Sequence, residues 1–278
     1  MSILIFSLLL LAGAFIAGLI GSLTGLGGGV VLTPLLTLAF HVDIRYAIGS
    51  SLIASIATSS GSAAAYVREG ITNMRLGMFL EIATTTGAVT GALLAVYTPT
   101  HVVAVIFGIV LIFSAIMSLR KHTEPQIDGK VSKLANWLKL NSNYPVKEKI
   151  VNYNVINVAG GYIVMTFAGI LSGLLGIGSG ALKVLALDTV MRIPFKVSTT
   201  TSNFMIGVTA AASAVVYFQR GYIDPGLSLP VVLGVLGGAV IGSRILIRTG
   251  GEWLKILFTI VISIMAIEMI YNGLSGKL

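Results

Sequence analysis

The chain has 278 residues, of which 55% are hydrophobic and only 10% are charged, whereas soluble domains carry roughly 25% charged residues. This composition excludes an ordinary soluble protein and predicts a multi-pass membrane protein. The net charge of +8 lies in short segments between apolar stretches, not on one basic face with interleaved aromatic residues, so nucleic acid is excluded as a partner.

Apolar stretches predict a series of helices in each half of the chain: a long helix, a glycine break, a short segment and three further helices. Each short segment has about a dozen residues, too few to cross about 30 Å of hydrocarbon, so we expect a half-helix or part of a re-entrant hairpin. The first-half bounds are Ile3 to Leu23, Val30 to Phe40, Tyr46 to Val67, Leu76 to Tyr97 and Val102 to Leu119. The second-half bounds are Tyr153 to Leu175, Ala181 to Met191, Val197 to Phe218, Gly226 to Ile247 and Leu254 to Tyr271.

The second half repeats the first at a constant offset of 151 residues. Residues 17–119 align with residues 168–270 without a gap, and the identical pairs include Ser51 with Ser202 and Tyr66 with Tyr217. A single offset shared by polar and aromatic residues argues against chance similarity of apolar sequence. We therefore predict an all-α membrane protein with two helical repeats, residues 1–119 and 151–278, joined by a basic linker, residues 120–150.

The Lys and Arg positions favour inverted repeats over parallel ones. With inverted repeats, the loops near residues 68–75, 120–149, 192–196 and 244–255 share one side and hold 14 basic residues, against three on the other side. Parallel repeats would give 11 against six. Because basic loops mark the cytoplasmic side, the linker 120–150 is predicted to be cytoplasmic.

A glycine-rich break separates the long helix from the short segment in each half. Inverted repeats with paired helix breaks place binding sites near the bilayer midplane, and a helix that restarts after a break offers unpaired N–H groups to an anion. The alternative is that the glycines only permit close helix packing. The break residues predicted to bind substrate are Gly25, Gly27, Gly28, Gly29, Gly176, Gly178, Ser179 and Gly180.

Polar residues that follow the breaks add candidate substrate ligands. Lys183 aligns with Leu32 of the other repeat; we expect it to face a cavity and contact the anion, with snorkelling to the membrane surface as the alternative. Hydroxyl and amide groups in the next helices are predicted to donate to the anion, with hydrogen bonds to their own helix as the alternative. These residues are Ser50, Ser51, Thr201, Ser202 and Asn203.

Two carboxylates, Glu81 and Glu268, lie within apolar helices. Solvation at the membrane interface is favoured for both, because Arg75 is near Glu81 and a helix end is near Glu268; proton coupling through Glu81 is the alternative. The three histidines lack a metal-binding spacing, and neither a nucleotide motif nor a catalytic constellation is found. Enzyme activity, a bound metal and a cofactor are therefore not predicted.

These motifs resemble those of the TauE/SafE family of sulfite and organosulfonate transporters. The resemblance rests on the first glycine motif with Pro34 behind it, its second-half echo, the run Gly49-Ser50-Ser51-Leu52 and the run Arg68-Glu69-Gly70. It covers about residues 11–272 except the linker. It implies an all-helical carrier of sulfur oxyanions, sulfonates or small carboxylates in the cytoplasmic membrane of a bacterium or archaeon, with the glycine motifs at the substrate site. Two positions depart from the first motif: Ser179 aligns with Gly28, and Leu185 aligns with Pro34.

The sequence thus predicts a secondary carrier that moves sulfite, an organosulfonate or a related small anion by alternating access, without ATP hydrolysis. The alternatives are a passive anion channel, a carrier of small carboxylates, and a membrane enzyme or assembly subunit that carries no flux, which the lack of catalytic groups disfavours. Beside the anion and the lipid bilayer, a coupling proton or cation and a second copy of the chain are left open as partners.

Overall fold

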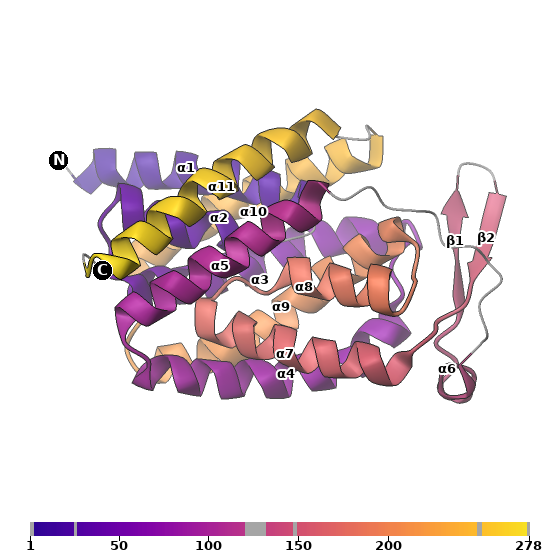
Figure 1. The fold of residues 1–278 in the computed structure, drawn as a ribbon. Helices are drawn as coiled ribbons and strands as arrows, with labels where there is room; N and C mark the ends of the chain where they lie inside the picture. Colours follow the sequence, from indigo (N-terminus) through magenta and orange to yellow (C-terminus); the bar gives the residue numbers. More distant parts are fainter. Residues whose placement is uncertain (1–2, 25–26, 120–131, 147–148, 249–251, 277–278) are drawn as a thin grey trace.

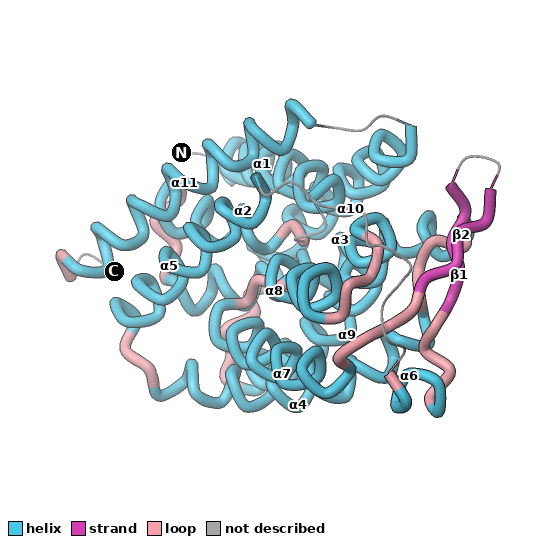
Figure 2. Tube along the Cα trace, turned by 45° about the vertical axis from the view of Figure 1, so that its right-hand side comes forward, coloured by secondary structure: helices cyan, strands magenta, loops and turns pink. Residues whose placement is uncertain are grey.

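The computed structural model describes residues 3–24, 27–119, 132–146, 149–248 and 252–276. Helices form the body of the molecule, and a small β-hairpin stands at one end (Figures 1 and 2). The first half contains α1 (Ile3–Thr24), α2 (Gly29–Pro34), the π-helix η1 (Leu35–Ala39), α3 (Ile44–Arg68), α4 (Met74–Tyr97) and α5 (Thr100–Leu119). The second half contains α7 (Val158–Leu175), α8 (Gly180–Leu185), the π-helix η2 (Ala186–Val190), α9 (Phe195–Gln219), α10 (Pro225–Arg248) and α11 (Glu252–Leu274).

Six of the described helices are long and apolar enough to cross a membrane, which confirms the prediction of a multi-pass membrane protein. Large apolar side chains stay exposed along them, including Leu8, Ile82 and Ile163, as expected for surfaces that face lipid. The six spans are Leu4–Ser22, Met74–Tyr97, Thr100–Met117, Val158–Leu175, Phe195–Gln219 and Pro225–Arg244.

The predicted helix ends lie within about three residues of the observed ones, except at the start of α7. The prediction of a helix from Tyr153 is wrong, because Tyr153 ends β2 (Lys149–Tyr153), which pairs antiparallel with β1 (Ser142–Val146). Asn157 then starts α7 with a left-handed backbone, and its side chain accepts a hydrogen bond from the N–H of Gly160. The hairpin and α6 (Lys133–Trp137) were not predicted, and the domain boundaries at 119 and 150 stay a prediction.

Each short segment consists of one α-helical piece and one π-helical turn. Gly29–Ala39 forms a continuous apolar helix of 11 residues, about 16 Å long at 1.5 Å per residue and therefore too short to span a membrane. The ring of Phe40 at its far end packs edge-on against Phe6 near the start of α1, with the ring centroids 5.4 Å apart. The chain thus folds back along α1, as expected for a helical hairpin. Because the second half makes the same π turn after Leu185, the turn does not depend on Pro34.

Close glycine contacts hold two pairs of helices in parallel. Gly234 and Gly242 of α10 lie against the carbonyl oxygens of Leu11 and Leu19 in α1. Small residues spaced four apart let membrane helices approach closely. The equivalent contacts of α7 with α4, which lie side by side in Figure 1, are Gly169 with Thr84 and Gly173 with Ala88.

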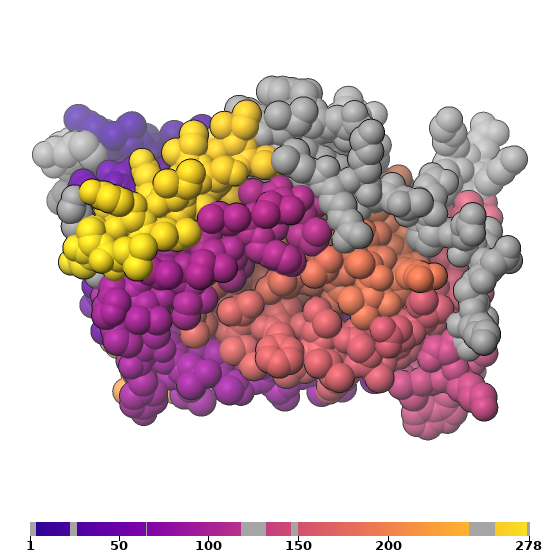
Figure 3. All heavy atoms as spheres, in the orientation of Figure 1, coloured from indigo at the N-terminus to yellow at the C-terminus, as the bar shows by residue number. Residues whose placement is uncertain are grey.

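Two other helix pairs pack antiparallel. The hydroxyl of Ser59 in α3 donates to the carbonyl of Asn203 in α9, at 2.6 Å, while Gly49 near the start of α3 lies against Tyr222 beyond the end of α9. Helix α11 lies along α5 on the face seen in Figure 3. There Gly273 contacts the carbonyl of His101, and Gly108 contacts that of Ala266. In each pair, one helix is the repeat counterpart of the other: α9 corresponds to α3, and α11 corresponds to α5.

Asn73 ties the hairpin region to the helical body. Its side-chain oxygen accepts from the N–H of Leu76 and caps α4, while its amide donates to the carbonyl of Leu140 and to the hydroxyl of Tyr153, both at 2.9 Å. Burial raises the pKa of Tyr153 to about 12. The phenol therefore stays protonated at physiological pH.

We expect Asn73→Ala to lower the free energy of unfolding by about 1–3 kcal/mol, because it removes the cap and leaves buried hydrogen-bonding groups without a partner. Asn73→Ser retains a capping oxygen and should recover part of the loss. Unfolding of the purified protein in mixed detergent micelles measures both changes. Equal losses for the two variants would show that the cap contributes little.

Candidate functional site

The two glycine breaks lie halfway along α3 and α9. Gly28 packs against Thr58 and Gly29 against Ser55, close to the midpoint of α3. In the second half Gly178 packs against Ile206 near the midpoint of α9. The predicted site residue Gly25 lies outside the described residues. The breaks are therefore deep inside the helical body and far from the ends of these helices.

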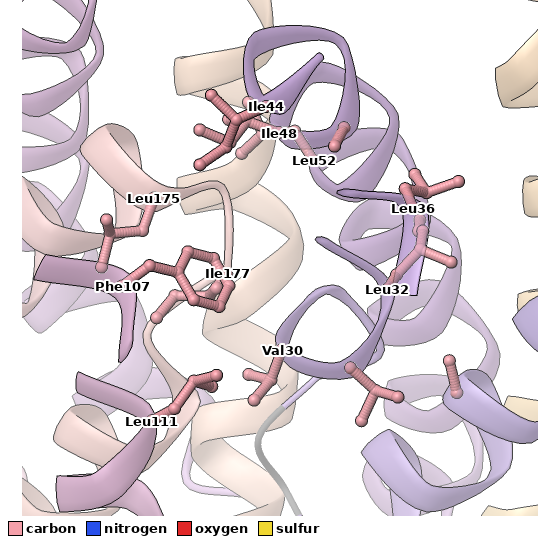
Figure 4. Close-up of a cluster of buried hydrophobic side chains, with 14 of the residues drawn as sticks. Val30, Leu32, Leu36, Ile44, Ile48, Leu52, Phe107, Leu111, Leu175 and Ile177 are labelled. Carbon is pink, nitrogen blue, oxygen red and sulfur yellow. The ribbon is translucent and has the colours of Figure 1, made fainter. Parts of the chain in front are cut away.

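The two breaks also contact one another. A Cβ atom added at Gly29 would lie 2.9 Å from the carbonyl oxygen of Gly176, and both Gly27 and Gly178 face Ile206. Figure 4 shows Val30 and Ile177, which adjoin the two breaks, within one buried apolar cluster. In this conformation the glycines pack closely, as the alternative interpretation expected, and they bring both predicted motifs to one place.

Backbone geometry explains why glycine is needed at part of this junction. Gly27, Gly176 and Gly178 have φ values of +82°, +69° and +67°, which L side chains rarely adopt. Ser179 also has a left-handed backbone, with φ of +48°, although it aligns with the helical Gly28. The departure of the second motif from the first is therefore a difference in backbone conformation as well as in side chain.

Ser51 and Ser202 fasten the short segments to the long helices. The hydroxyl of Thr33 in α2 donates to that of Ser51, at 2.7 Å, and the hydroxyl of Ser202 donates to the carbonyl of Gly180, at 3.3 Å. The hydroxyls of Ser51 and Ser202 thus pair with the short segments and not with carbonyls of their own helices, which was the alternative for these residues. These two predicted residues thus lie at the breaks in corresponding positions of the two halves.

Ser50 and Thr201 lie at other helix contacts. The hydroxyl of Ser50 is 3.5 Å from that of Ser228 in α10, and the hydroxyl of Thr201 accepts from the backbone N–H of Asn73 at the start of α4, at 3.1 Å. The structure does not bring these two predicted ligands to the glycine junction.

Several buried polar atoms of the second break and of helices α3 and α9 have no protein partner. Both amide atoms of Asn203 are unpaired although its side chain is fully buried. The hydroxyls of Ser55, Ser179 and Thr199 are also buried and unpaired. Leaving such a group without a hydrogen bond costs about 1–3 kcal/mol, and native proteins retain few of them. Two of these hydroxyls lie at the breaks, because Ser55 packs against Gly29 and Ser179 belongs to the second break. Asn203 and Thr199 lie on α9, next to Ser202 and three residues before it. Unpaired donors of this kind indicate a binding place for a polar ligand.

Lys183 and Glu81 are joined through Thr209. The ammonium of Lys183, whose side chain is completely buried, donates to the hydroxyl of Thr209. That hydroxyl lies 2.6 Å from Oε1 of Glu81. The hydroxyl of Thr84 lies 3.3 Å from that of Thr209, and the hydroxyl of Thr85 donates to Oε1 of Glu81, also at 3.3 Å. Burial of Lys183 shows that the snorkelling alternative is wrong. Interfacial solvation of Glu81 is likewise wrong, because only 8% of the residue is exposed.

Sequence reasoning missed Thr209 and Ser55 as site residues. Thr209 aligns with Thr58 of the first half, so the repeat marked it as retained in both copies, but threonine in a membrane helix commonly bonds to its own helix. The hydroxyl of Thr209 lies 3.0 Å from the carbonyl oxygen of Met205 and 2.6 Å from Oε1 of Glu81, and its single proton is donated to one of them at a time. When it donates to Glu81 and accepts from Lys183, it bridges the two charges. Glu268, by contrast, is exposed on α11.

A groove of about 520 Å³ lies away from the junction, where α3, α9 and the start of α10 meet. Its lining contains no charged side chain, and an anion is not stabilised by such a surface. The lining residues are Ile53, Ile56, Ala211, Ala214, Val215, Phe218, Ile223, Pro225, Ser228, Leu229 and Val232.

Comparison with known proteins identifies the family. The sequence profile described as "Sulfite exporter TauE/SafE" matches residues 10–269. The chain belongs to the TauE/SafE family. Two relatives from Bacillus subtilis, the probable membrane transporter proteins YunE and YdhB, are 28% and 27% identical to it, covering 93% and 85% of this chain and 95% and 89% of their own lengths.

Relatives of this TauE/SafE protein extend to archaea. A probable membrane transporter protein of Methanocaldococcus jannaschii is 23% identical over 96% of both chains. No solved structure matches the chain. The family and its relatives mark the protein as a probable membrane transporter, a class that is generally not enzymatic.

Proposed function

We propose that this TauE/SafE protein is a secondary carrier of small anions, with sulfite, organosulfonates and related sulfur oxyanions as its substrates. The observation that carries the proposal is that the two glycine breaks contact one another and hold buried, unpaired donors, Ser55 beside Gly29 and Ser179 in the second break, with the unpaired amide of Asn203 beside Ser202 on α9. The amide of Asn203 and the hydroxyls of Ser55, Ser179 and Thr199 can all donate to oxyanion oxygens. The fully buried Lys183 adds a positive charge near the second break. The name of the family, sulfite exporter, supports the substrate class.

Inverted repeats are part of this proposal. A two-fold axis in the membrane plane turns each helix upside down in its copy, so copies that meet at the axis pack antiparallel. The antiparallel packing of α3 with α9 and of α5 with α11 supports this arrangement over a parallel one. With the basic linker 120–150 in the cytoplasm, the protein would lie in the cytoplasmic membrane and alternate between two related conformations.

The close contact of the breaks indicates a closed conformation in this mechanism. With Gly29 packed against Gly176 and Ser55, an oxyanion reaches the unpaired donors once the two short segments move apart. Each short segment is fastened to its long helix by one serine, Ser51 or Ser202. Movement of α2 and α8 relative to each other is thus the step that would open the site to either side.

Counterflow in proteoliposomes tests the function directly. With the membrane potential held at zero by equal potassium on both sides and valinomycin, vesicles preloaded with unlabelled sulfite should concentrate labelled sulfite transiently, which a passive channel cannot do under these conditions. A thermal-shift screen with sulfite, thiosulfate, ethanesulfonate, taurine and short carboxylates should identify the substrate class, because ligands stabilise the folded state by mass action. Absence of both counterflow and stabilisation with all these anions would contradict the proposal.

Asn203→Leu should separate binding from folding. Its aligned residue in the first half is Leu52, so leucine is tolerated at this place in one repeat, and it removes two unpaired polar atoms. We expect unchanged or higher stability together with at least a tenfold loss of anion affinity. Ser60→Ala, on the exposed side of α3, is the control and should leave binding unchanged. Full anion stabilisation in Asn203→Leu would rule out a contact with this amide.

A further inference from the structure

We propose that Glu81, Thr209 and Lys183 form a proton-linked switch, in which Glu81 takes up one proton for each anion that Lys183 binds. The inference rests on the proposed function and names its coupling ion. It is carried by the hydrogen-bonded chain from the ammonium of Lys183 through the hydroxyl of Thr209 to Oε1 of Glu81. The other carboxylate oxygen, Oε2, is buried without a partner.

Charge balance gives the direction of coupling. In the empty site the buried ammonium and the buried carboxylate neutralise one another through Thr209. Binding a monovalent anion to Lys183 would leave one uncompensated negative charge in an apolar interior, which is costly. A proton on Oε2 of Glu81 restores neutrality and releases the ammonium from its carboxylate partner. Anion and proton therefore bind together and are released together.

The ammonium of Lys183 can reach both the hydroxyl of Thr209 and an anion bound at the second break. Side chains on a helix slope back toward its N-terminus, so Lys183, the fourth of the six residues of α8, extends toward the break at Ser179 and Gly180. The first half independently shows that this threonine position lies beside the break. There Gly28, which aligns with Ser179, packs against Thr58, which aligns with Thr209. Thr209 thus lies beside the break, and a small swing of the flexible lysine stem exchanges its hydroxyl for an anion at the unpaired donors.

The helices that pack against α4 carry three other titratable side chains, Tyr162, Lys196 and Tyr217, within their described ranges. Helices α7 and α9 pack against α4. On α7, Tyr162 packs against Phe79, with ring centroids 5.6 Å apart. On α9, Lys196 and Tyr217 lie 13 and eight residues from Thr209, or about 20 and 12 Å along the helix. Among the charged groups that the structure describes on these helices and on α8, Lys183 is the one that a hydrogen-bonded chain links to Glu81.

Proton counting on the purified full-length protein tests the switch. Ethanesulfonate, which stays a monoanion between pH 5 and 8, is titrated calorimetrically in two buffers of different ionisation enthalpy. Wild type should take up about one proton per anion bound, and its affinity should rise up to tenfold for each unit by which the pH falls in the coupled range. Glu81→Gln should bind without proton uptake and with little pH dependence. Glu268→Gln, at the exposed carboxylate of α11, should behave as wild type.

A second pair of variants covers the case in which Glu81→Gln does not fold. Thr209→Val breaks the chain between the two charges and should reduce the proton count, whereas Thr209→Ser keeps the hydroxyl and should restore it. Anion binding without proton uptake in wild type, or an unchanged count in Glu81→Gln or Thr209→Val, would overturn the switch and leave the carrier proposal standing. If wild type bound neither this probe nor sulfite or thiosulfate, the carrier proposal would fail, and the switch with it.

Discussion

Lys183→Leu is expected to destabilise the protein by about 3–5 kcal/mol, because it leaves the buried carboxylate of Glu81 without its cation. Removing one partner of a buried ion pair costs more than removing both, since the remaining charge keeps its full desolvation penalty. The double variant Lys183→Leu/Glu81→Val should therefore recover most of the loss. Leucine and valine already occupy the aligned positions, Leu32 and Val232, in the other repeats of the sequence.

The measurement is a double-mutant cycle on the free energy of unfolding in mixed micelles of dodecyl maltoside and sodium dodecyl sulfate. Additive losses would show that Lys183 and Glu81 do not act as a pair. Recovery of stability without recovery of anion transport would show that the pair is kept for function and not for the fold. The cycle needs no substrate, so its result is independent of which anion the protein carries.

The helices and the repeated order of elements were predictable because each depends on local sequence. Apolar stretches of about 20 residues set the spans, and the offset of 151 residues located the same elements in both halves. The short segments were predictable from their length alone. The fold-back of η1 onto the start of α1, seen in the contact of Phe40 with Phe6, agrees with the predicted hairpin.

The link between Lys183 and Glu81 through Thr209 was not predictable, because 102 positions separate the two charged residues and neither has a charged counterpart in the other repeat. Arg75, six residues from Glu81, was a plausible partner in sequence, yet its guanidinium donates to the carbonyl of Lys139 instead. Tertiary packing of α8, α9 and α4 decides this pairing. The β-hairpin was not predicted because its strands have only five residues each, and β1 and the start of β2 lie within the segment predicted as a hydrophilic linker.

Gly238→Ala should be severely destabilising, whereas Gly237→Ala on the next residue of α10 should not. A Cβ at Gly238 would lie 2.0 Å from the carbonyl oxygen of Phe15 in α1, while a Cβ at Gly237 would lie 3.5 Å from the Phe15 ring, which is ordinary contact. The backbone of α1 cannot move aside as a flexible side chain does. The two helices must therefore separate along the contacts of Gly234, Gly238 and Gly242 with α1. We expect a loss of about 2–3 kcal/mol or more for Gly238→Ala.

Gly237→Ala should be neutral or stabilising by up to about 1 kcal/mol, because alanine favours the helix over glycine. The two substitutions change composition identically and sit 100° apart on one helix, so a difference between them reports packing against α1 and not helix propensity. Mixed-micelle unfolding measures both. Equal stability of the two variants would mean that α1 and α10 do not pack through Gly238. Since Gly87 makes the matching contact between α4 and α7, against the carbonyl of Thr166, Gly87→Ala should reproduce the loss in the other half of the molecule.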